Sequence, residues 1–562
     1  MNKAQSDVWW KNTITYCLDV KTFLDSDGDG WGDLAGLERK LGYLRDLGVG
    51  CIWLTPCYPS PMRDDGYDIS DYYSVDPRLG TLGQFVELVR TAHALGMRVV
   101  MDLVVNHTSD EHPWFAQAAD NGSRYHDYYL WSRTRPDPQP PVVFPGEQKQ
   151  TWSWNRSARS YYFHRYHDFQ PDLAFGRADV HDEIHQILGF WLELGIDGFR
   201  VDSLPFLIDK PGREDEPVED RHGDLRTLRG FLSRRNGEAV LLGEANVPVE
   251  EQRRFFGDPS CPHDESEAQV LFDFEMQASI WLALARGCAE PIVRALRGRP
   301  DLPGSCTYAV FARHHDELTF EQVLSKAEAQ EVRAAFDPDG VGWIYDRGLR
   351  RRLASLLGGD ESRMRLAISL VMALPGMPVL HYGDEIGLRD DLGLPGRLAT
   401  RPPMRWSPGD GGFSTAPPKA WVRPPAPAGG GVKDSVAEQR SDPDSVLSFT
   451  RHAMSLRRDC QEIGHGSNRV LESPDPAVLL VESTWLDGVV LTAHNLSDRR
   501  VERALGDDLP EEPLDDVVDL TESRLVDLRE PLSLDPFGVR WLRVREPGRI
   551  SRSAAGHASA TE

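Results

Sequence analysis

The stretch RVVMDLVVNH, residues 98–107, is an apolar, β-branched run that ends in a polar pair. It predicts a buried strand, and seven comparable runs occur between residues 13 and 385. They are TITYCLDV (13–20), CIWLTP (51–56), GFRVD (198–202), AVLLGEA (239–245), VLFDFEM (270–276), YAVFARHHDE (308–317) and VLHYGDE (379–385). Helical patterns separate them, for example at 34–48 and 181–195. This alternation predicts an α/β protein built on a (β/α)8 TIM barrel, whose functional residues follow the strand C-termini.

Departures from this alternation predict the domain organisation. Between the third strand and the next helix, a long stretch rich in Trp, Tyr, Pro and Asp predicts an inserted lid subdomain over the barrel mouth. Alternating apolar segments near the end predict an antiparallel β-sandwich. The expected units are barrel 1–105 and 177–445, insertion 106–176, C-terminal helix and β-domain 446–546, and a disordered tail 547–562. The Gly- and Pro-rich stretch 414–431 is expected to be a flexible or surface excursion.

Composition restricts the partners and the compartment. The chain has 562 residues, with 63 Lys and Arg against 88 Asp and Glu, which gives a formal net charge of −25. This charge repels phosphate backbones and anionic lipids, and no apolar run approaches the ~20 residues that cross a bilayer. We therefore expect neither nucleic acid nor a membrane as a partner. Seven cysteines without a CxxC pair, and a beginning without an apolar leader, predict a reduced, cytoplasmic protein. Monomer and homo-oligomer both stay open.

Three acids end predicted strands: Asp202 in GFRVD, Glu244 in LLGE and Asp316 in RHHD. A single Asp or Glu is most often a solvated carboxylate or a helix cap, but three such strand ends converge on one barrel mouth. Retaining cleavage of a glycosidic bond needs a nucleophilic carboxylate and a protonated partner about 5–5.5 Å apart, which neighbouring strands can supply. Arg200, two residues before Asp202, would keep that nucleophile ionised.

Five motifs resemble the α-amylase family, glycoside hydrolase family 13. They are DLVVNH (102–107), GFRVD (198–202), GEAN (243–246), HHDE (314–317) and GMPVLHYGDE (376–385). The resemblance implies a retaining α-glucosyl enzyme with Asp202 as nucleophile, Glu244 as general acid/base and Asp316 as transition-state stabiliser. The residues it places around the substrate are Asp64, Tyr67, His107, Arg200, His315 and Arg401, and Gln170 in FQPDL is expected beside them. Tyr166, an aromatic residue of the insertion, is expected to help enclose the substrate, with core packing as the alternative. A pair between Asp64 and Arg401 is expected to close the pocket behind one glucose, which favours small α-glucosides.

The segment DSDGDGWGD, residues 25–33, has acids at positions 1, 3, 5 and 9 of an EF-hand-like loop and glycine at position 6. Position 12 is Gly36, so the loop is no true EF-hand, and a plain acidic turn is the alternative. Resemblance to calcium loops of the family implies a structural Ca²⁺ and no organic cofactor. Its ligands would be Asp25, Asp27, Asp29, Trp31 and Asp33. A second Ca²⁺ beside the insertion would use Asn106, Asp172 and Asp209.

Within the family, the chain most resembles the trehalose synthases, which interconvert maltose and trehalose. The stretches that carry this resemblance include FLDSDGDGWGDLAGL, PCYPSPMRDDGYDISDYYSV and ARHHDELT. It implies that the glucosyl unit on Asp202 passes to the retained glucose instead of to water. His314, Ala174 and Arg405 depart from the usual residues and are expected near the pocket rim. An α-glucosidase that hydrolyses maltose is therefore the alternative, and a catalytically silent scaffold or sugar-binding protein is a third hypothesis.

Overall fold

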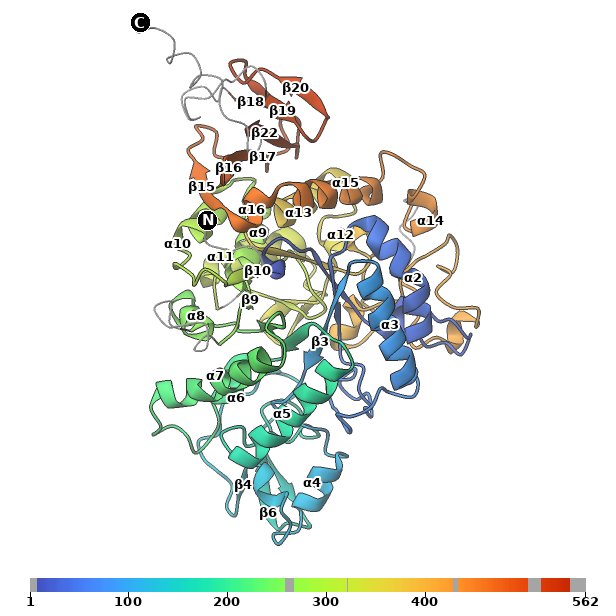
Figure 1. Ribbon diagram of the computed structural model, residues 1–562, viewed down its shortest axis with the longest axis vertical. Coiled ribbons are helices and arrows are strands. Elements are labelled where there is room, and N and C mark those ends of the chain that lie inside the picture. Colours follow the sequence, from blue (N-terminus) through green and yellow to red (C-terminus); the bar gives the residue numbers. More distant parts are fainter. Residues whose placement is uncertain (1–7, 258–266, 321, 428–432, 504–516, 546–562) are drawn as a thin grey trace, which may run out of the picture.

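The computed structural model describes residues 8–257, 267–320, 322–427, 433–503 and 517–545. Eight parallel strands close into a barrel in the order β1-β2-β3-β7-β8-β9-β10-β14. They are β1 (Thr15–Leu18), β2 (Cys51–Leu54), β3 (Arg98–Leu103), β7 (Gly198–Val201), β8 (Val240–Gly243), β9 (Val270–Phe272), β10 (Thr307–Val310) and β14 (Met377–His381). Each lies within or overlaps one of the eight predicted runs, which confirms the predicted TIM barrel (Figure 1).

Helices surround the barrel because their apolar stripes pack against the outward-facing side chains of the strands. The main ones are α2 (Leu34–Leu47), α3 (Leu82–Ala94), α5 (Ala178–Glu193), α7 (Val218–Arg235), α9 (Phe274–Arg286), α10 (Glu290–Gly298), α11 (Lys326–Phe336) and α13 (Glu361–Ala373). Polar caps define where several begin. The side chain of Asp33 accepts from the backbone N–H of Gly36 at the start of α2, and Thr81 with Gln84 forms a capping box on α3.

One glycine allows two strands of the catalytic side to approach closely. Gly198 begins β7 with φ +151°, and a Cβ at this position would lie 2.2 Å from the carbonyl oxygen of Val240 on β8. Only glycine accommodates both the backbone conformation and this contact. The close pairing of β7 and β8 places the residues that follow these strands side by side at the barrel mouth.

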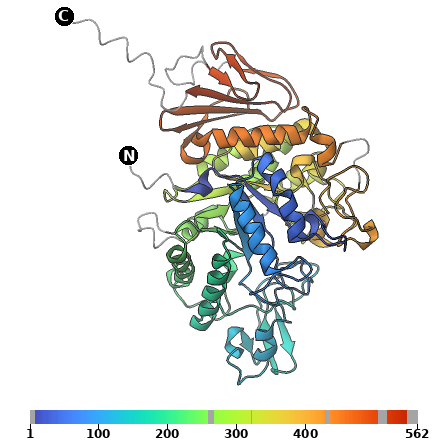
Figure 2. The ribbon, with the colours of Figure 1, turned by 45° about the vertical axis from the view of Figure 1, so that its right-hand side comes forward.

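The predicted insertion after the third strand is present. Between β3 and α5 the chain forms helix α4 (Pro113–Ala118) and a three-stranded antiparallel sheet. The sheet has the order β4-β6-β5, from β4 (Trp131–Ser132), β5 (Trp152–Asn155) and β6 (Ser160–Phe163). A hydrogen bond from Leu173 N–H to the Asn106 carbonyl, 2.9 Å long, joins the two ends of the insertion. The insertion lies at the opposite end of the molecule from the C-terminal sheet (Figures 1 and 2).

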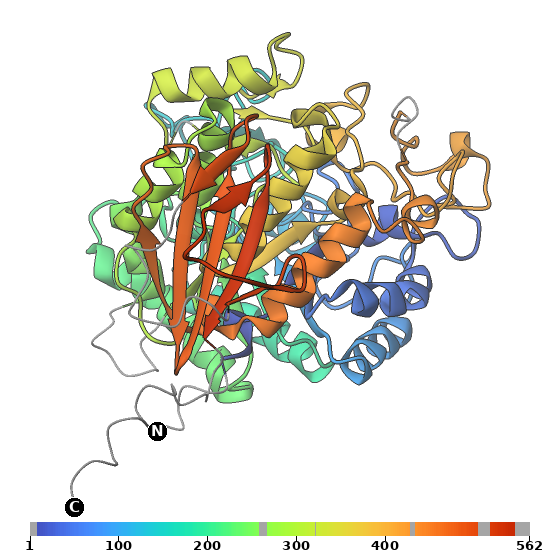
Figure 3. The same cartoon turned by 90° about the horizontal axis from the view of Figure 1, so that it is seen from above.

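The C-terminal antiparallel sheet domain is confirmed as well. After helix α15 (Val446–Asp459), a six-stranded sheet has the order β15-β16-β17-β22-β19-β20, and β18 pairs separately with β21. Figure 3 looks down onto these strands. Their bounds are β15 (Ser467–Leu471), β16 (Val478–Trp485), β17 (Gly488–Asn495), β18 (Val501–Arg503), β19 (Val517–Asp519), β20 (Arg524–Val526), β21 (Leu532–Leu534) and β22 (Val539–Arg545). Ser369 of α13 bonds to both Trp541 Nε1 and His494 Nε2 at 3.0 Å, which joins this domain to the barrel.

The stretch 414–431 was expected to be a flexible or surface excursion, and its described part runs along the surface, with Thr415 and residues 417–420 exposed. Residues 413–427, which we call the strap, pack against the acidic loop 25–33 with Phe413 and Trp421 buried. The N–H of Val422 donates to the carbonyl of Gly30 at 2.8 Å. A proline- and glycine-rich composition reduces the content of regular helix and strand. It does not prevent aromatic side chains and backbone groups from packing against a neighbouring segment. Residues 428–431 and the tail 547–562 lie outside the described residues.

Within the described ranges, no helix combines the length and apolar character that a membrane span requires. Six of the seven cysteines lie in these ranges, and all six are free thiols. Five of them are buried, so they contribute apolar packing.

Replacing Trp541 by Ala is expected to reduce the free energy of unfolding by about 3–5 kcal/mol, because this side chain is 1% exposed and fills the interface with α13. Urea unfolding followed by tryptophan fluorescence and circular dichroism measures the change. Trp154→Ala is the control: Trp154 is 48% exposed, and its loss should cost less than about 1 kcal/mol. Equal effects of the two substitutions would contradict this account of the interface.

Candidate active site

Arg200 links the two acids predicted to perform the covalent chemistry. Asp202 is the first residue after β7, and Glu244 is the first after β8. Arg200 Nη1 lies 2.7 Å from Asp202 Oδ1, and Nη2 lies 2.6 Å from Glu244 Oε2. The guanidinium is only 1% exposed, so it cannot exchange these carboxylates for water. One cation therefore fixes the relative position of both acids.

Glu244 has the electrostatic properties of a proton donor. Burial, together with the negative charges of Asp202 and Asp316, raises its pKa to about 7. Arg200 and the backbone N–H of Ser203, 3.1 Å from Oε2, act in the opposite direction. A carboxyl group with a pKa near neutrality can hold a proton and release it during the reaction.

Asp102 is a buried member of the site that the sequence analysis missed. It lies on β3 directly beside Arg200 of β7, and its Oδ1 is 2.7 Å from Arg200 Nη1. Its other oxygen accepts hydrogen bonds from Tyr67 Oη at 3.0 Å and from Trp53 Nε1 at 3.3 Å. Burial raises the pKa of Asp102 to about 6 despite the opposing charge of Arg200. The available signal was an acid within the apolar run RVVMDL, where a charge needs a partner.

Asp316, on the opposite side of the cavity, has two arginines and a histidine as neighbours. Its Oδ1 lies 2.8 Å from Arg397 Nη1 and 2.7 Å from Arg401 Nη2, while His315 Nε2 is 3.1 Å from Oδ2. Burial alone would raise the pKa of Asp316, but His315, Arg397 and Arg401 hold it well below its ordinary range. Asp316 thus stays ionised, as a group that stabilises developing positive charge must.

The predicted ion pair between Asp64 and Arg401 is wrong. Arg397, in the short 3-10 helix η6 (Gly396–Thr400), reaches Asp64 with Nη2 at 2.8 Å from Oδ1. Arg401 is already occupied by Asp65 and Asp316, so it has no free arm for Asp64. Asp64 still pairs with an arginine that lines the cavity, but that arginine comes from four residues earlier.

The predicted substrate-binding residues fall into two groups. Asp64, Tyr67, His107 and Tyr166 line the cavity together with the three catalytic candidates. The other four do not line it but bond to residues that do. Gln170 Nε2 donates to Asp64 at 2.9 Å, and His315 Nε2 lies 2.6 Å from Tyr67 Oη. Arg200 and Arg401 hold the catalytic acids, as described above.

The cavity has a volume of about 710 Å³, which exceeds the space of a single glucose unit. Beyond the acids it is lined by Phe144 and Tyr166 of the insertion and by residues of the barrel loops. Glu317 and Arg347 form an ion pair of 2.5 Å on this side. Sequence reasoning missed Phe144, Glu317, Arg347 and Arg397 as site residues, because the loops that bring them together have no periodic pattern.

Only one of the three sequence departures lies where it was expected. His314 lines the cavity. Arg405 instead makes a buried pair with Asp434, 3.0 Å from Nε to Oδ1, and is not among the lining residues. Ala174 N–H donates to the carbonyl of Tyr128 inside the insertion and also lies away from the cavity. Arg405 and Ala174 therefore have no direct contact with a bound sugar.

The acidic loop fits a divalent oxygen-seeking cation. Carboxylate oxygens of Asp25, Asp27 and Asp29 lie within 4.8 Å of one another. Hydrogen bonds from Ser414 and from backbone N–H groups lower the pKa of Asp25 although burial opposes this. Asp33 caps helix α2 through Gly36 N–H at 2.7 Å. This set of hard oxygen donors, with Gly30 at φ +99°, is compatible with Ca²⁺.

The predicted second calcium site is contradicted. The ammonium of Lys210 lies between its supposed ligands, 2.6 Å from Asn106 Oδ1 and 2.5 Å from Asp172 Oδ2. The side chain of Asp209 is 65% exposed and pairs with Arg165. The ammonium of Lys210 therefore supplies the positive charge that a metal would bring. The sequence signal that was overlooked is this lysine, which directly follows the supposed ligand Asp209.

Together, the barrel and the carboxylates that Arg200 holds at its mouth define an enzyme site suited to acid–base and nucleophilic chemistry on a glycosidic bond. Residues 20–294 match the family described as alpha amylase, catalytic domain. The "Trehalose synthase/amylase TreS" of Mycobacterium tuberculosis is 38% identical over 498 residues, covering 87% of this chain and 82% of the relative. The "Trehalose synthase" of Pimelobacter sp. is 35% identical over 560 residues, covering 97% of both chains.

A solved structure extends the likeness to the fold. The trehalulose synthase MutB from Pseudomonas mesoacidophila MX-45 superimposes with a TM-score of 0.77 at 22% identity, covering 96% of this chain and 99% of that one. The chain belongs to the α-amylase family, glycoside hydrolase family 13.

The value of kcat/KM for maltose consumption is expected to fall as the pH rises through about 7. Glu244 must carry a proton to act as the acid, and it loses this proton above its pKa. A pH–rate profile from pH 5 to 9 measures the descending limb. Glu244→Gln should lower turnover by about 10²–10⁴-fold and remove that limb. A limb that stays at the same pH in Glu244→Gln would assign it to another group.

Proposed function

We propose that the protein is a trehalose synthase, which interconverts maltose and trehalose by intramolecular transglucosylation. The observation that carries the proposal is the continuous ion-pair chain Asp64–Arg397–Asp316, whose three members all line the cavity. We propose that this chain closes one end of the cavity. A pocket closed at this end accepts a terminal glucose unit and excludes a chain that passes through. The two relatives above, both with trehalose synthase in their names, support the choice of a disaccharide.

The proposed reaction proceeds in two displacements. Asp202 attacks the anomeric carbon of the non-reducing glucose of maltose, while Glu244 gives its proton to the departing glycosidic oxygen. A glucosyl ester on Asp202 and a free glucose result. Glu244, now a carboxylate, then takes the proton from the anomeric hydroxyl of that glucose. The resulting oxygen attacks the glucosyl carbon, releases Asp202 and forms trehalose, and Glu244 is again protonated, now with the proton from the anomeric hydroxyl.

Transfer to glucose requires that water be kept from the glucosyl ester. Phe144 and Tyr166 of the insertion line the cavity, and Phe144 also contacts Tyr345 of a barrel loop. The ring of Phe144 lies 4.8 Å from that of Tyr345 and 5.7 Å from that of Tyr166. The Arg397 guanidinium lies 5.2 Å from the centre of the Phe144 ring. We propose that this aromatic cover holds the free glucose beside Asp202.

Hydrolysis of maltose is the second candidate, and one observation favours it. The cavity extends past Glu244 to polar residues of α7 and of helix α8 (Val249–Phe256), including Arg221, Glu251 and Arg254. Polar groups at this side would hold water near the reacting carbon. An α-glucosidase would use the same first displacement and differ only in the second acceptor.

The two candidates are separated by incubating the protein with maltose and free ¹⁴C-glucose. A trehalose synthase forms mainly trehalose, with little label incorporated, because the released glucose stays in the cavity. Glucose release without trehalose would instead identify a hydrolase, and heavily labelled trehalose would show an open acceptor site. Asp202→Ala is the control: it should form neither product, and turnover by this variant would refute the nucleophile.

We also propose one structural Ca²⁺, bound by the acidic loop 25–33. Metal analysis after dialysis should find about one Ca²⁺ per chain, since Lys210 already supplies the charge at the second position. Asp27→Asn should abolish it, whereas Asp172→Asn should leave the calcium content unchanged. Two Ca²⁺ per chain, or none, would contradict the proposal.

A cytoplasmic location is proposed on the free thiols. The six described cysteines form no disulfide, which suits a reducing compartment.

A further inference from the structure

The strap brings a buried arginine to the back of the active site. Arg423 is 4% exposed, and its guanidinium bonds to two groups and lies 3.6 Å from a third, the carboxylate of Asp19. Nη2 bonds to the carboxylate of Asp65, and Nη1 donates to the backbone carbonyl of Arg401 at 2.7 Å. The planar guanidinium of Arg423 thereby holds the side chain of Asp65 and the main chain of Arg401, which is itself paired with Asp65. Arg423 does not line the cavity, so it has no direct contact with a substrate there.

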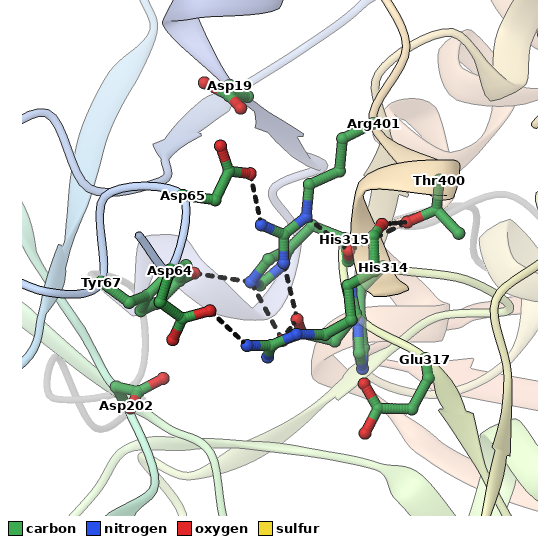
Figure 4. Close-up of polar contacts among 12 residues, drawn as sticks. Asp19, Asp64, Asp65, Tyr67, Asp202, His314, His315, Glu317, Thr400 and Arg401 are labelled. Atoms are coloured by element: carbon green, nitrogen blue, oxygen red, sulfur yellow. Dashed lines mark hydrogen bonds and ion pairs between the residues drawn. The ribbon is translucent and has the colours of Figure 1, made fainter. Parts of the chain in front are cut away.

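Asp65 connects Arg423 to Arg401, the arginine that pairs with the catalytic acid Asp316 (Figure 4 shows the bond between Asp65 and Arg401). Its Oδ2 accepts from Arg401 Nη1 at 2.5 Å, and the other arm of Arg401, Nη2, lies 2.7 Å from Asp316. Burial would raise the pKa of Asp65, but the charges of Arg423, Lys21 and Arg401 hold it well below its ordinary value. Asp65 is thus a buried anion that depends on its cations, and its position sets how Arg401 faces Asp316.

The strap itself is held by the acidic loop. The N–H of Asp25 donates to the Phe413 carbonyl at 3.0 Å, and the Ser414 hydroxyl donates to the Asp25 carboxylate. A Cβ on Gly30 would lie 2.1 Å from the carbonyl oxygen of Ala420, so the two backbones touch where only glycine fits. Arg423 therefore enters the site from a segment whose path is fixed outside the barrel.

We propose that Arg423 is a positioning residue, which holds Asp65 and the Arg401 backbone so that Arg401 presents Nη2 to Asp316. Loss of Arg423 leaves Asp65 with Lys21 and Arg401 as its remaining cations. Arg401 then turns toward Asp65, and Asp316 loses one of its two arginines. The inference deepens the proposed function, because the affected acid is the transition-state stabiliser of that reaction.

The first experiment compares Arg423→Met with a matched control. Arg405 is also 4% exposed and makes a single buried pair with Asp434, but it does not line the cavity. Both substitutions should lower the thermal unfolding temperature. Arg423→Met should reduce kcat/KM for maltose consumption about tenfold or more, mainly through kcat, whereas Arg405→Met stays within about threefold. Arg423→Lys should recover stability more than rate, because an ammonium lacks the planar two-arm geometry.

A double-mutant cycle tests whether Arg423 acts through Asp65. In the Asp65→Asn background, Arg423→Met should lower kcat/KM by less than about a further threefold, because the contact between Arg423 and Asp65 is already lost. Additive losses would overturn the proposal, as would a kcat/KM of Arg423→Met within about twofold of the parent chain.

A crystal structure of Arg423→Met makes the test independent of the proposed function. Arg401 Nη2 displaced from Asp316 supports the proposal, and an unmoved Arg401 overturns it. Because maltose consumption is followed whichever product forms, a chain that releases only glucose refutes the trehalose synthase proposal and leaves this test intact. If maltose is not consumed at all, the proposed function fails and the crystal structure alone decides.

Discussion

The guanidinium of Arg200 is the interaction on which the site depends. It lies on β7 against Asp102 of β3, and its two arms also hold Asp202 and Glu244. Three carboxylates around one buried cation leave an excess of negative charge, which burial makes costly. The site responds by favouring protonation: the pKa of Glu244 rises to about 7 and that of Asp102 to about 6. Removing the cation would leave these acids buried without compensation.

Around Asp316, on the opposite side of the cavity, positive charge exceeds negative charge. Asp316 faces Arg397, Arg401 and His315, and its pKa is held well below the ordinary range. Identical chemical groups therefore receive different tasks from their surroundings: Glu244 can carry a proton, whereas Asp316 keeps its charge. Behind this wall, the strap adds a cation that does not touch the cavity. The catalytic division of labour thus depends on segments far apart in the chain.

Much of this arrangement could be predicted from local sequence. The eight strands were identifiable because buried parallel strands are short apolar runs, and the acids followed because each ends such a run. The errors share one cause. Arg401 was paired with Asp64 on the family resemblance of its motif, and no sequence pattern shows that Arg397, four positions earlier, reaches Asp64 instead. Lys210 was overlooked because only the oxygen-bearing side chains were considered, and these suggest a metal where the lysine ammonium lies. Composition predicted a flexible or surface excursion for the strap, but it gave no sign that Phe413 and Trp421 are buried there.

The sequence by itself determined the barrel, the insertion, the C-terminal sheet and the identity of the three catalytic candidates. These features depend on periodicity and on residues adjacent to strands, which are local properties of the chain. Only the tertiary structure decided which arginine pairs with Asp64, which cation neutralises Asp172, and that Arg423 joins the catalytic wall. Such pairings are decided by the paths of loops and by competition among buried charges, and neither has a signature in the order of residues.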